Sequence, residues 1–333
     1  MDEFARLGSE QRRDVFADAA AELGLLPAIV EKDFWVCFVL QLLFTRLSLR
    51  GHFVFKGGTS LSKAYRLIQR FSEDIDLILD WQLLGYESQA PLQAQSSKAQ
   101  QDKFNKELNR RAGLFISEQL TPELAALLAE IGIGLSTGND PADLHVINVI
   151  YPAAFPESYI RPVVRLEIGP LGSWVPSEYR SIRPYAADVF PHLFSGPHCT
   201  LRTISAERTF WEKATILHQE AHRTGVMPQR HSRHYYDLHQ LALSPIRDGA
   251  LQQIGLLRDV VQFKQLFYPS AWARYDLAIP GSFRLLPSSS QQAAALKKDY
   301  EDMAVMVFGD RPRFDSLLTV LGQLEADINS LKS

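Results

Sequence analysis

Two carboxylates lie two residues apart in a stretch that is typical of a β-strand. Side chains alternate between the two faces of a strand, so in residues 73–79 (EDIDLIL) Asp74 and Asp76 should share one face. The β-prone run Val163 to Ile168 places Arg165 and Glu167 on one face in the same way. Carboxylates on adjacent strands can hold two Mg²⁺ ions about 3.5 to 4 Å apart. The sequence therefore predicts a magnesium site at Asp74 and Asp76, with Glu167 as a candidate third ligand.

A glycine pair comes directly before these carboxylates in the sequence. The run KGGTS comprises Lys56, Gly57, Gly58, Thr59 and Ser60. Glycines let the backbone approach phosphate oxygens, the helix that follows offers unpaired N–H groups, and Thr59 and Ser60 add hydroxyl donors. The run lacks the Gly-Lys-Thr/Ser ending of a Walker A loop. Each piece alone is common as a plain turn or a polar strand end, but together they suit nucleotidyl transfer, which needs both metal and phosphate ligands.

Cations that could contact a polyanion gather between residues 202 and 239. On the helix predicted over residues 206–221, the neighbours of Lys213 three and four positions away are Thr209, Phe210, Ile216 and Leu217. Its stem could therefore lie along apolar surface with the ammonium directed inward. Asp237 begins a later helical pattern. The alternatives are a solvated lysine and a carboxylate favoured by the helix dipole.

Arg230, Arg233 and Tyr235 combine cations with an aromatic ring, which suits single-stranded RNA, although a structural aromatic is the competing interpretation. His218 and His222 have the i, i+4 spacing of a metal pair, but a surface pair is the more common outcome. The net charge of −3 means that any site for a polyanion must be local.

The elements that must position these residues can be placed approximately. We expect an α/β fold with a mixed sheet, followed by a mainly helical C-terminal part. Residues 1–190 should form the catalytic domain with N-terminal helices, and residues 191–333 a helical domain that contributes to the active-site cleft. Strands are predicted near 52–55, 73–79, 145–151 and 163–168, and helices over 9–23, 27–43, 60–69 and about 101–131. Loops are predicted over 132–143 and 170–197, and residues 89–101 are predicted to be an exposed loop or the start of a helix.

The cellular setting follows from what the sequence does not contain. Cys37 and Cys199 have no CxxC spacing, which argues against a disulfide framework or a zinc site. We see no secretory signal and no apolar run of the roughly 20 residues that a membrane span requires. A cytoplasmic protein is expected.

The sequence resembles the AbiEii/AbiGii (MenT-like) toxin nucleotidyltransferases. The similarity covers roughly residues 31–241 and is carried by EKDFW (31–35), FKGGTSLSKAY (55–65), RFSEDIDL (70–77), RLEI (165–168), TFWEK (209–213) and RHYYDL (233–238). It implies a polymerase-beta-like fold, Mg²⁺, a nucleoside triphosphate (NTP) substrate and a toxin-antitoxin or phage-defence (abortive infection) role. It also implies that Lys213 contacts the triphosphate and that Asp237 completes the active site. Glu167 departs from the pattern, because polymerase-beta enzymes more often have Asp there.

The resemblance further implies an acceptor and a partner. Some members transfer nucleotides to the 3′ end of tRNA, and the usual partner is a winged-helix antitoxin encoded nearby. Two other functions stay open: nucleotide transfer to a protein hydroxyl (AMPylation) on the same site, and a non-catalytic binding protein. Labelled NTPs would distinguish transfer to tRNA from transfer to protein by whether the label enters RNA or protein. The intact Asp74, Asp76, Lys213 and Asp237 argue against a non-catalytic binding protein.

Overall fold

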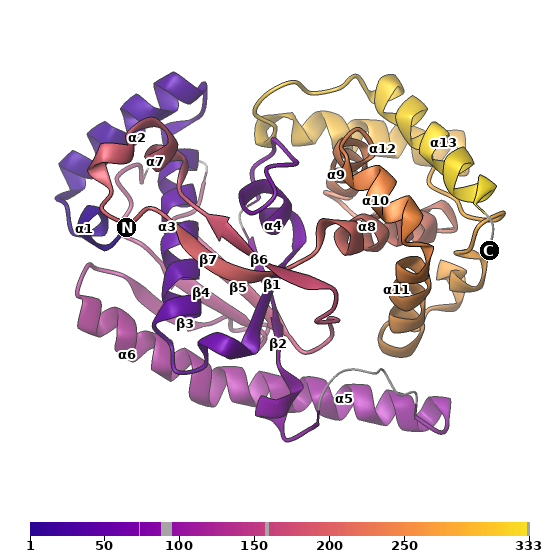
Figure 1. The fold of residues 1–333 in the computed structure, drawn as a ribbon, viewed down its shortest axis with the longest axis horizontal. Helices are drawn as coiled ribbons and strands as arrows, with labels where there is room; N and C mark the ends of the chain where they lie inside the picture. Colours follow the sequence, from indigo (N-terminus) through magenta and orange to yellow (C-terminus); the bar gives the residue numbers. More distant parts are fainter. Residues whose placement is uncertain (73, 88–94, 157–159, 332–333) are drawn as a thin grey trace. The chain divides into compact units, whose positions relative to one another are not determined.

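The computed structural model describes residues 1–72, 74–87, 95–156 and 160–331 (Figure 1). These residues form two compact units, which are described separately. Unit 1 comprises Met1–Ala64 and Phe71–Ile204, and unit 2 comprises Tyr65–Arg70 and Ser205–Ser333. The chain therefore leaves unit 1 for six residues and returns before its last passage into unit 2. The expected boundary between residues 190 and 191 falls inside unit 1.

Unit 1 is built on a mixed seven-stranded sheet with the order β3-β4-β5-β2-β1-β7-β6. Pairs β1–β7 and β2–β5 are parallel, and β1–β2, β3–β4, β4–β5 and β6–β7 are antiparallel. The strands are β1 (Phe53–Lys56), β2 (Asp74–Leu79), β3 (Ser136–Asn139), β4 (Val146–Ile150), β5 (Val163–Gly169), β6 (Ser177–Ile182) and β7 (Cys199–Ile204). This arrangement confirms the predicted α/β class with a mixed sheet.

Three strands were not predicted from the sequence. β3 lies in the run 132–143, and β6 with the short helix α7 lies in the run 170–197, both of which we expected to be loops. β6 is an edge strand with mostly polar residues, so it carries no apolar alternation that would reveal it. The third, β7, lies where we expected helical structure to begin. The side chains of Leu201 and Thr203 on this strand are buried in the core.

The helices of unit 1 mostly follow the predicted pattern. They are α1 (Asp2–Ala5), α2 (Ser9–Leu23), α3 (Pro27–Thr45), α4 (Gly57–Lys63), α5 (Lys98–Phe115), α6 (Thr121–Ile131) and α7 (Tyr185–Val189), with a π-helical turn η3 (Ile116–Leu120) between α5 and α6. Short 3₁₀ turns are η1 (Arg50–His52), η2 (Trp81–Leu84) and η4 (Pro191–Leu193). Residues 89–94 of the predicted segment 89–101 lie outside the described residues.

Helix α3 is the buried centre of unit 1. Nearly all of its side chains are inaccessible, and it packs against β5 and β7 of the sheet and against α2 and α7 (Figure 1). Asp33 on this helix forms an ion pair with Lys63 at the end of α4, with Oδ1 and Nζ 2.6 Å apart, and accepts a hydrogen bond from the Tyr185 amide at 2.7 Å. Removing one partner of such a buried pair typically costs about 3 to 5 kcal/mol. The pair therefore fixes α4 against the core.

Unit 2 is mainly helical. Its helices are α8 (Ala206–Ala221), α9 (Ser232–Ala242), α10 (Ile246–Gln252), α11 (Ile254–Phe267), α12 (Ser290–Asp302) and α13 (Phe314–Ser330), with 3₁₀ turns η5 (Ala271–Ala273), η6 (Tyr275–Leu277) and η7 (Met303–Met306). Ser205 caps α8, because its hydroxyl accepts a hydrogen bond from the Arg208 amide at 3.2 Å. No helix among the described residues is long and apolar enough to cross a membrane.

The helix α8 contacts α9, α10 and α11 through its buried stripe. His218 lies in this core and is fully buried. Its Nδ1 accepts a hydrogen bond from the Arg284 amide at 3.1 Å, which leaves Nε2–H to donate to the Arg274 carbonyl at 3.0 Å. Both ring nitrogens are used, so His218 is a structural residue and does not form a metal pair with His222.

We expect His218 to make the protein acid-sensitive. Burial lowers the pKa of His218 to about 4 in the folded protein, whereas an unfolded histidine titrates near 6.5. The unfolded chain therefore binds the proton first, and stability is complete above pH ~6.5 and is lost as the pH falls toward 4. Between pH 7 and pH 5, the free energy of unfolding of His218→Gln should fall by roughly 2 kcal/mol less than that of wild type. Urea unfolding at the two pH values measures this, and equal losses in both proteins would contradict it.

Candidate functional site

The register of the central strands places the predicted carboxylates in neighbouring positions. Asp74 pairs with Arg165 and Asp76 with Glu167 across β2 and β5, while Lys56 pairs with Asp76 across β1 and β2. Ile75 and Leu77, which alternate with the two aspartates, are at most 1% exposed, so the predicted division of faces is confirmed. Lys56, Asp76 and Glu167 thus form one row across three strands.

Gly57 brings the glycine turn against the carboxylate of Asp76. Its φ is +81°, and a Cβ added to it would lie 1.9 Å from Oδ2 of Asp76. No other residue type fits there, because any side chain would overlap with the carboxylate. The first turn of α4, with the backbone N–H groups that no helical carbonyl accepts, therefore lies directly beside Asp76.

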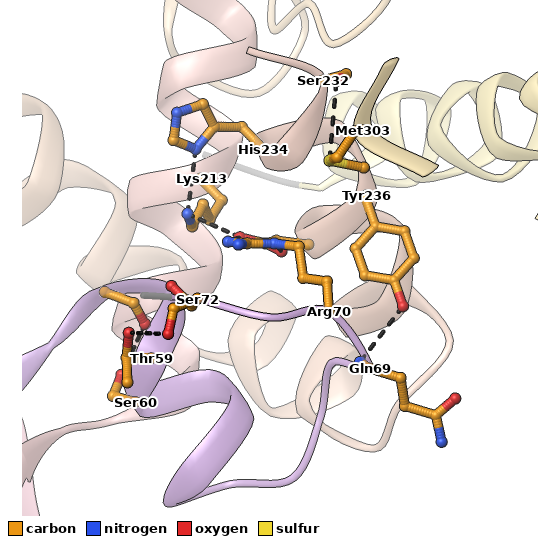
Figure 2. A network of polar contacts seen from close by, with 12 residues as sticks. Thr59, Ser60, Gln69, Arg70, Ser72, Lys213, Ser232, His234, Tyr236 and Met303 are labelled. Carbon is orange, nitrogen blue, oxygen red and sulfur yellow. Dashed lines mark hydrogen bonds and ion pairs between the residues drawn. The ribbon is translucent and has the colours of Figure 1, made fainter. Parts of the chain in front are cut away.

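The hydroxyls of Thr59 and Ser60 have a different role from the predicted one. Both residues are at most 1% exposed. Thr59 Oγ1 donates to the carbonyl oxygen of Asp74 and lies 3.5 Å from that of Ser72 (Figure 2), and Ser60 Oγ donates to the Gly57 carbonyl at 2.8 Å. We predicted that these hydroxyls contact phosphate, whereas in the structure both donate to backbone carbonyls. They hold α4 to the start of β2, which keeps the turn and Asp74 together.

Arg165 is a site residue to which the sequence assigned no role. Its guanidinium lies 3.0 Å from Asp140 Oδ2, 3.6 Å from Glu167 Oε1 and 3.8 Å from Asp74 Oδ1. Glu167 and Asp74 are partly exposed. Arg165 therefore links the two carboxylates and offsets part of their charge, although carboxylates still outnumber cations here. The sequence signal that could have revealed this role is the position of Arg165 two residues before Glu167 on a strand, which places both side chains on one face.

The donor set of this face fits a magnesium ion. Carboxylate oxygens are the hard ligands that Mg²⁺ prefers, and Asp74, Asp76 and Glu167 come from adjacent strands. Among the described residues no three His, Cys, Asp or Glu side chains are grouped as a ready metal cluster. The fit therefore rests on the pair Asp74 and Asp76, with Glu167 within reach of Arg165 on the neighbouring strand.

In unit 2, Lys213 and Asp237 come together as a buried ion pair. Lys213 Nζ lies 2.9 Å from Asp237 Oδ2, and the two side chains are 9% and 0% exposed. Arg70 also binds Asp237, with Nε donating to Oδ1 at 2.6 Å and Nη2 donating to Oδ2 at 2.8 Å. Asp237 thus contacts two cations at once, and this bidentate geometry is the strongest form of an arginine–carboxylate pair.

The three charges shift one another's titration. Burial alone would raise the pKa of Asp237, but Arg70 and Lys213 outweigh it and lower the pKa to about 2. Burial lowers the pKa of Lys213, against the opposing effect of Asp237. Asp237 therefore stays ionised across the physiological range, and it is a poor proton acceptor.

His234 completes this cluster. Lys213 Nζ donates to His234 Nδ1 at 3.1 Å (Figure 2). Burial and then the nearby Lys213 lower the pKa of His234 well below its usual value, so the imidazole is neutral. A neutral ring with Nδ1 as acceptor can orient the ammonium.

Arg70 is the second residue that sequence reasoning left without a role, although it opens one of the quoted motifs. The Gln69 amide donates to the Tyr236 hydroxyl at 3.3 Å (Figure 2), and the Gln69 carbonyl accepts from the Phe308 amide at 2.9 Å. Arg70 also forms a β-bridge with Val307. These contacts fix the segment Tyr65–Arg70 within unit 2, and only tertiary structure reveals them.

The predicted RNA-binding residues differ in their surroundings. Arg230 is exposed with a φ of +61°, and the carboxylate of Asp299 accepts from its amide at 2.6 Å. Arg233 is half-buried. Tyr235 is 2% exposed, so its ring has no face on which an RNA base can stack. The structure thus gives no support to the predicted stacking role of Tyr235, and the two arginines remain as candidates.

Comparisons with known proteins point to one family. The family model described as nucleotidyl transferase AbiEii toxin, type IV TA system, matches residues 41–320. Among solved structures, the chain is similar to MenT4, a nucleotidyltransferase toxin from Mycobacterium tuberculosis H37Rv. The identity is 16% and the TM-score 0.53, over 96% of this chain and 90% of that chain. At this identity the likeness shows the fold alone. No curated protein sequence matches the chain.

We expect Gly57→Ala to destroy the acidic site rather than merely weaken the fold. Gly24 is a matched control, because its φ of +64° is similar but nothing lies within 4 Å of an added Cβ. The left-handed backbone costs either alanine about 1 to 2 kcal/mol. Only Gly57→Ala also displaces Asp76, so it should lose nucleotide transfer and more stability than Gly24→Ala in urea unfolding. Equal activity and stability in the two variants would contradict the close contact.

Proposed function

Because the chain belongs to the AbiEii family of nucleotidyltransferase toxins of type IV toxin-antitoxin systems, we propose that it transfers a nucleoside monophosphate from an NTP to the 3′ end of tRNA with the help of Mg²⁺. The observation that carries the proposal is the contact of the Gly57 turn with Asp76, beside Asp74 and Glu167. It joins a phosphate-binding backbone to carboxylates that suit a divalent cation.

The residues of unit 1 have separate parts in this proposal. Asp74, Asp76 and Glu167 hold the metal, while the backbone from Gly57 to Ser60 and the ammonium of Lys56 receive phosphate oxygens. Magnesium bound there would offset phosphate charge and favour ionisation of the attacking hydroxyl. Thr59 keeps the two groups in place through its bond to the Asp74 carbonyl.

Unit 2 supplies cations. Lys213 contacts the triphosphate, with its ammonium oriented by His234 and Asp237. Arg230 and Arg233 are proposed to contact the sugar-phosphate backbone of the RNA acceptor, which needs charge but no aromatic ring. NTPs and tRNA meet in the cytoplasm, where we place the activity, and a winged-helix antitoxin encoded nearby is the proposed regulator.

We predict that Asp74→Ala and Asp76→Ala each abolish nucleotide transfer while the protein stays folded, since each change removes a metal ligand but little core. EDTA should have the same effect on wild type. Glu178 on the edge strand β6 is a control, because it is an exposed carboxylate of the same sheet that pairs with Arg180. The measurement is incorporation of each labelled NTP in turn into total cell extract, with Glu178→Ala expected to match wild type.

Transfer that persists in EDTA, or in the Asp74→Ala/Asp76→Ala double variant, would overturn the metal assignment. The same assay identifies the acceptor by digestion of the labelled product. Label that is released by protease and resists ribonuclease would replace tRNA by a protein hydroxyl on the same site.

We further predict that expression arrests bacterial growth and that tRNA from the arrested cells carries 3′ extensions. Arg230→Gln/Arg233→Gln should reduce RNA modification and weaken the salt dependence of RNA binding, because fewer phosphate contacts release fewer counterions. NTP binding should be unchanged. Arg258→Gln removes an exposed cation of α11 and serves as the control. Unextended tRNA together with full toxicity of the double variant would contradict both the acceptor and its binding residues.

A further inference from the structure

The sheet face that carries the acidic row continues across unit 1 to the edge strand β6. Phe55 of β1 pairs with Thr203 of β7, and both side chains are fully buried on the opposite face. Lys56 and Arg202, one residue away from these two, therefore share the face of the acidic row. Arg202 in turn pairs with Tyr179 across β7 and β6. Tyr179 thus lies on this face as well.

Trp174 borders the acidic row on the same face. Its ring packs against Val54 and Ile78, which belong to a buried cluster of unit 1. Val54 is two residues from Lys56 on β1, and Ile78 is two residues from Asp76 on β2. Two residues along a strand span about 7 Å. The indole ring therefore follows directly after the acidic row on this face.

Arg202 is stacked on this tryptophan. Its Cζ lies 5.0 Å from the centroid of the Trp174 ring, and its Nε donates a hydrogen bond to Ser177 Oγ at 2.8 Å. The two contacts hold the guanidinium in one orientation, while the side chain stays partly exposed. A guanidinium held in this way is a flat cationic surface, and unpaired RNA bases stack on such planes.

Tyr179 extends this surface to the edge of the sheet. It is 74% exposed, more than any other tyrosine, tryptophan or phenylalanine among the described residues. Its Cβ should lie about 5 Å from that of Arg202, which it opposes. The next pair on this face, Ser181 and Thr200, is exposed too. The Tyr179 ring therefore offers a face to a ligand, as the buried Tyr235 does not.

We propose that Trp174, Arg202 and Tyr179 form a stacking surface for unpaired bases at the 3′ end of the RNA acceptor. The proposal rests on the proposed function for the identity of the acceptor. Tyr179 lies three strands from Asp76, about 14 Å at the usual strand spacing, so RNA that ends at the carboxylates passes over the surface. Three planar side chains in a row suit successive bases of a strand, whereas an NTP has only one base.

A purely structural role is the rival interpretation. Arg202 would then only cover Trp174 and the core beneath it. Tyr179 would be a single exposed side chain on an edge strand, which is common on protein surfaces. In that case its loss would leave the affinity for RNA unchanged. Because the Tyr179 side chain is mostly exposed, its variants keep the core intact and can decide between the two interpretations.

The first experiment measures binding of a fluorescently labelled single-stranded RNA oligonucleotide to the full chain without NTP, so that no transfer takes place. Tyr179→Ala should weaken binding about five- to a hundredfold, the usual effect of losing one stacked base, and Tyr179→Phe should bind like wild type. Tyr268→Ala removes an exposed tyrosine of unit 2 and is the control. Wild-type affinity in folded Tyr179→Ala would overturn the stacking surface.

The salt dependence of the same binding separates stacking from charge. Tyr179→Ala should keep the wild-type slope of log affinity against log salt, because it loses no phosphate contact. Arg202→Lys keeps the charge but loses the guanidinium plane, so it should bind more weakly with the slope retained. A smaller slope in Tyr179→Ala would mean lost phosphate contacts and would contradict stacking. Wild-type affinity in Arg202→Lys would remove Arg202 from the surface.

The last experiment distinguishes the base of the acceptor from that of the NTP. In steady-state transfer, Tyr179→Ala should raise KM for RNA and leave KM for the NTP unchanged. A raised KM for the NTP alone would assign the surface to the base of the NTP and overturn the proposal. The proposed function fails separately, when wild type transfers no labelled nucleotide to any acceptor. RNA binding that depends on Tyr179 would still establish the stacking surface.

Discussion

The parallel register between β2 and β5 is the constraint on which the acidic site depends. It sets Asp74 against Arg165 and Asp76 against Glu167, so that three carboxylates and one cation occupy neighbouring positions on one face. A slip by one residue would turn Ile75 and Leu77 outward and bury the carboxylates among apolar side chains. The burial of Ile75 and Leu77 therefore selects the register, and the site takes its geometry from the hydrophobic core behind it.

Local patterns predicted this part of the molecule well, because strand alternation and glycine chemistry depend on residues close in sequence. The face shared by Asp74 and Asp76 and the turn at Gly57 are such features. Properties set by distant residues could not be predicted. The hydroxyls of Thr59 and Ser60 were expected to reach a ligand, but their acceptors are carbonyls that the turn brings near. Tyr235 was expected to stack on an RNA base, but its ring is buried in the structure.

The same limit explains the strands and cations that were missed. The polar edge strand β6 has no apolar alternation, and only its pairing with β7 defines it as a strand. Arg70 lies 167 residues from its partner Asp237, and no short-range pattern marks such a pair. The division into units also depends on contacts between residues that are distant in sequence. The six residues from Tyr65 to Arg70 belong to unit 2, although the residues before and after them in the sequence belong to unit 1.

The charged clusters of the two units differ in the exposure of their side chains. In unit 1 the carboxylates are partly exposed, so a cation can exchange with water there without opening the core. In unit 2, by contrast, Arg70 and Lys213 are buried, and both form ion pairs with the fully buried carboxylate of Asp237. Both oxygens of Asp237 are bound by these two cations, so the burial of Arg70 and Lys213 depends on this one carboxylate.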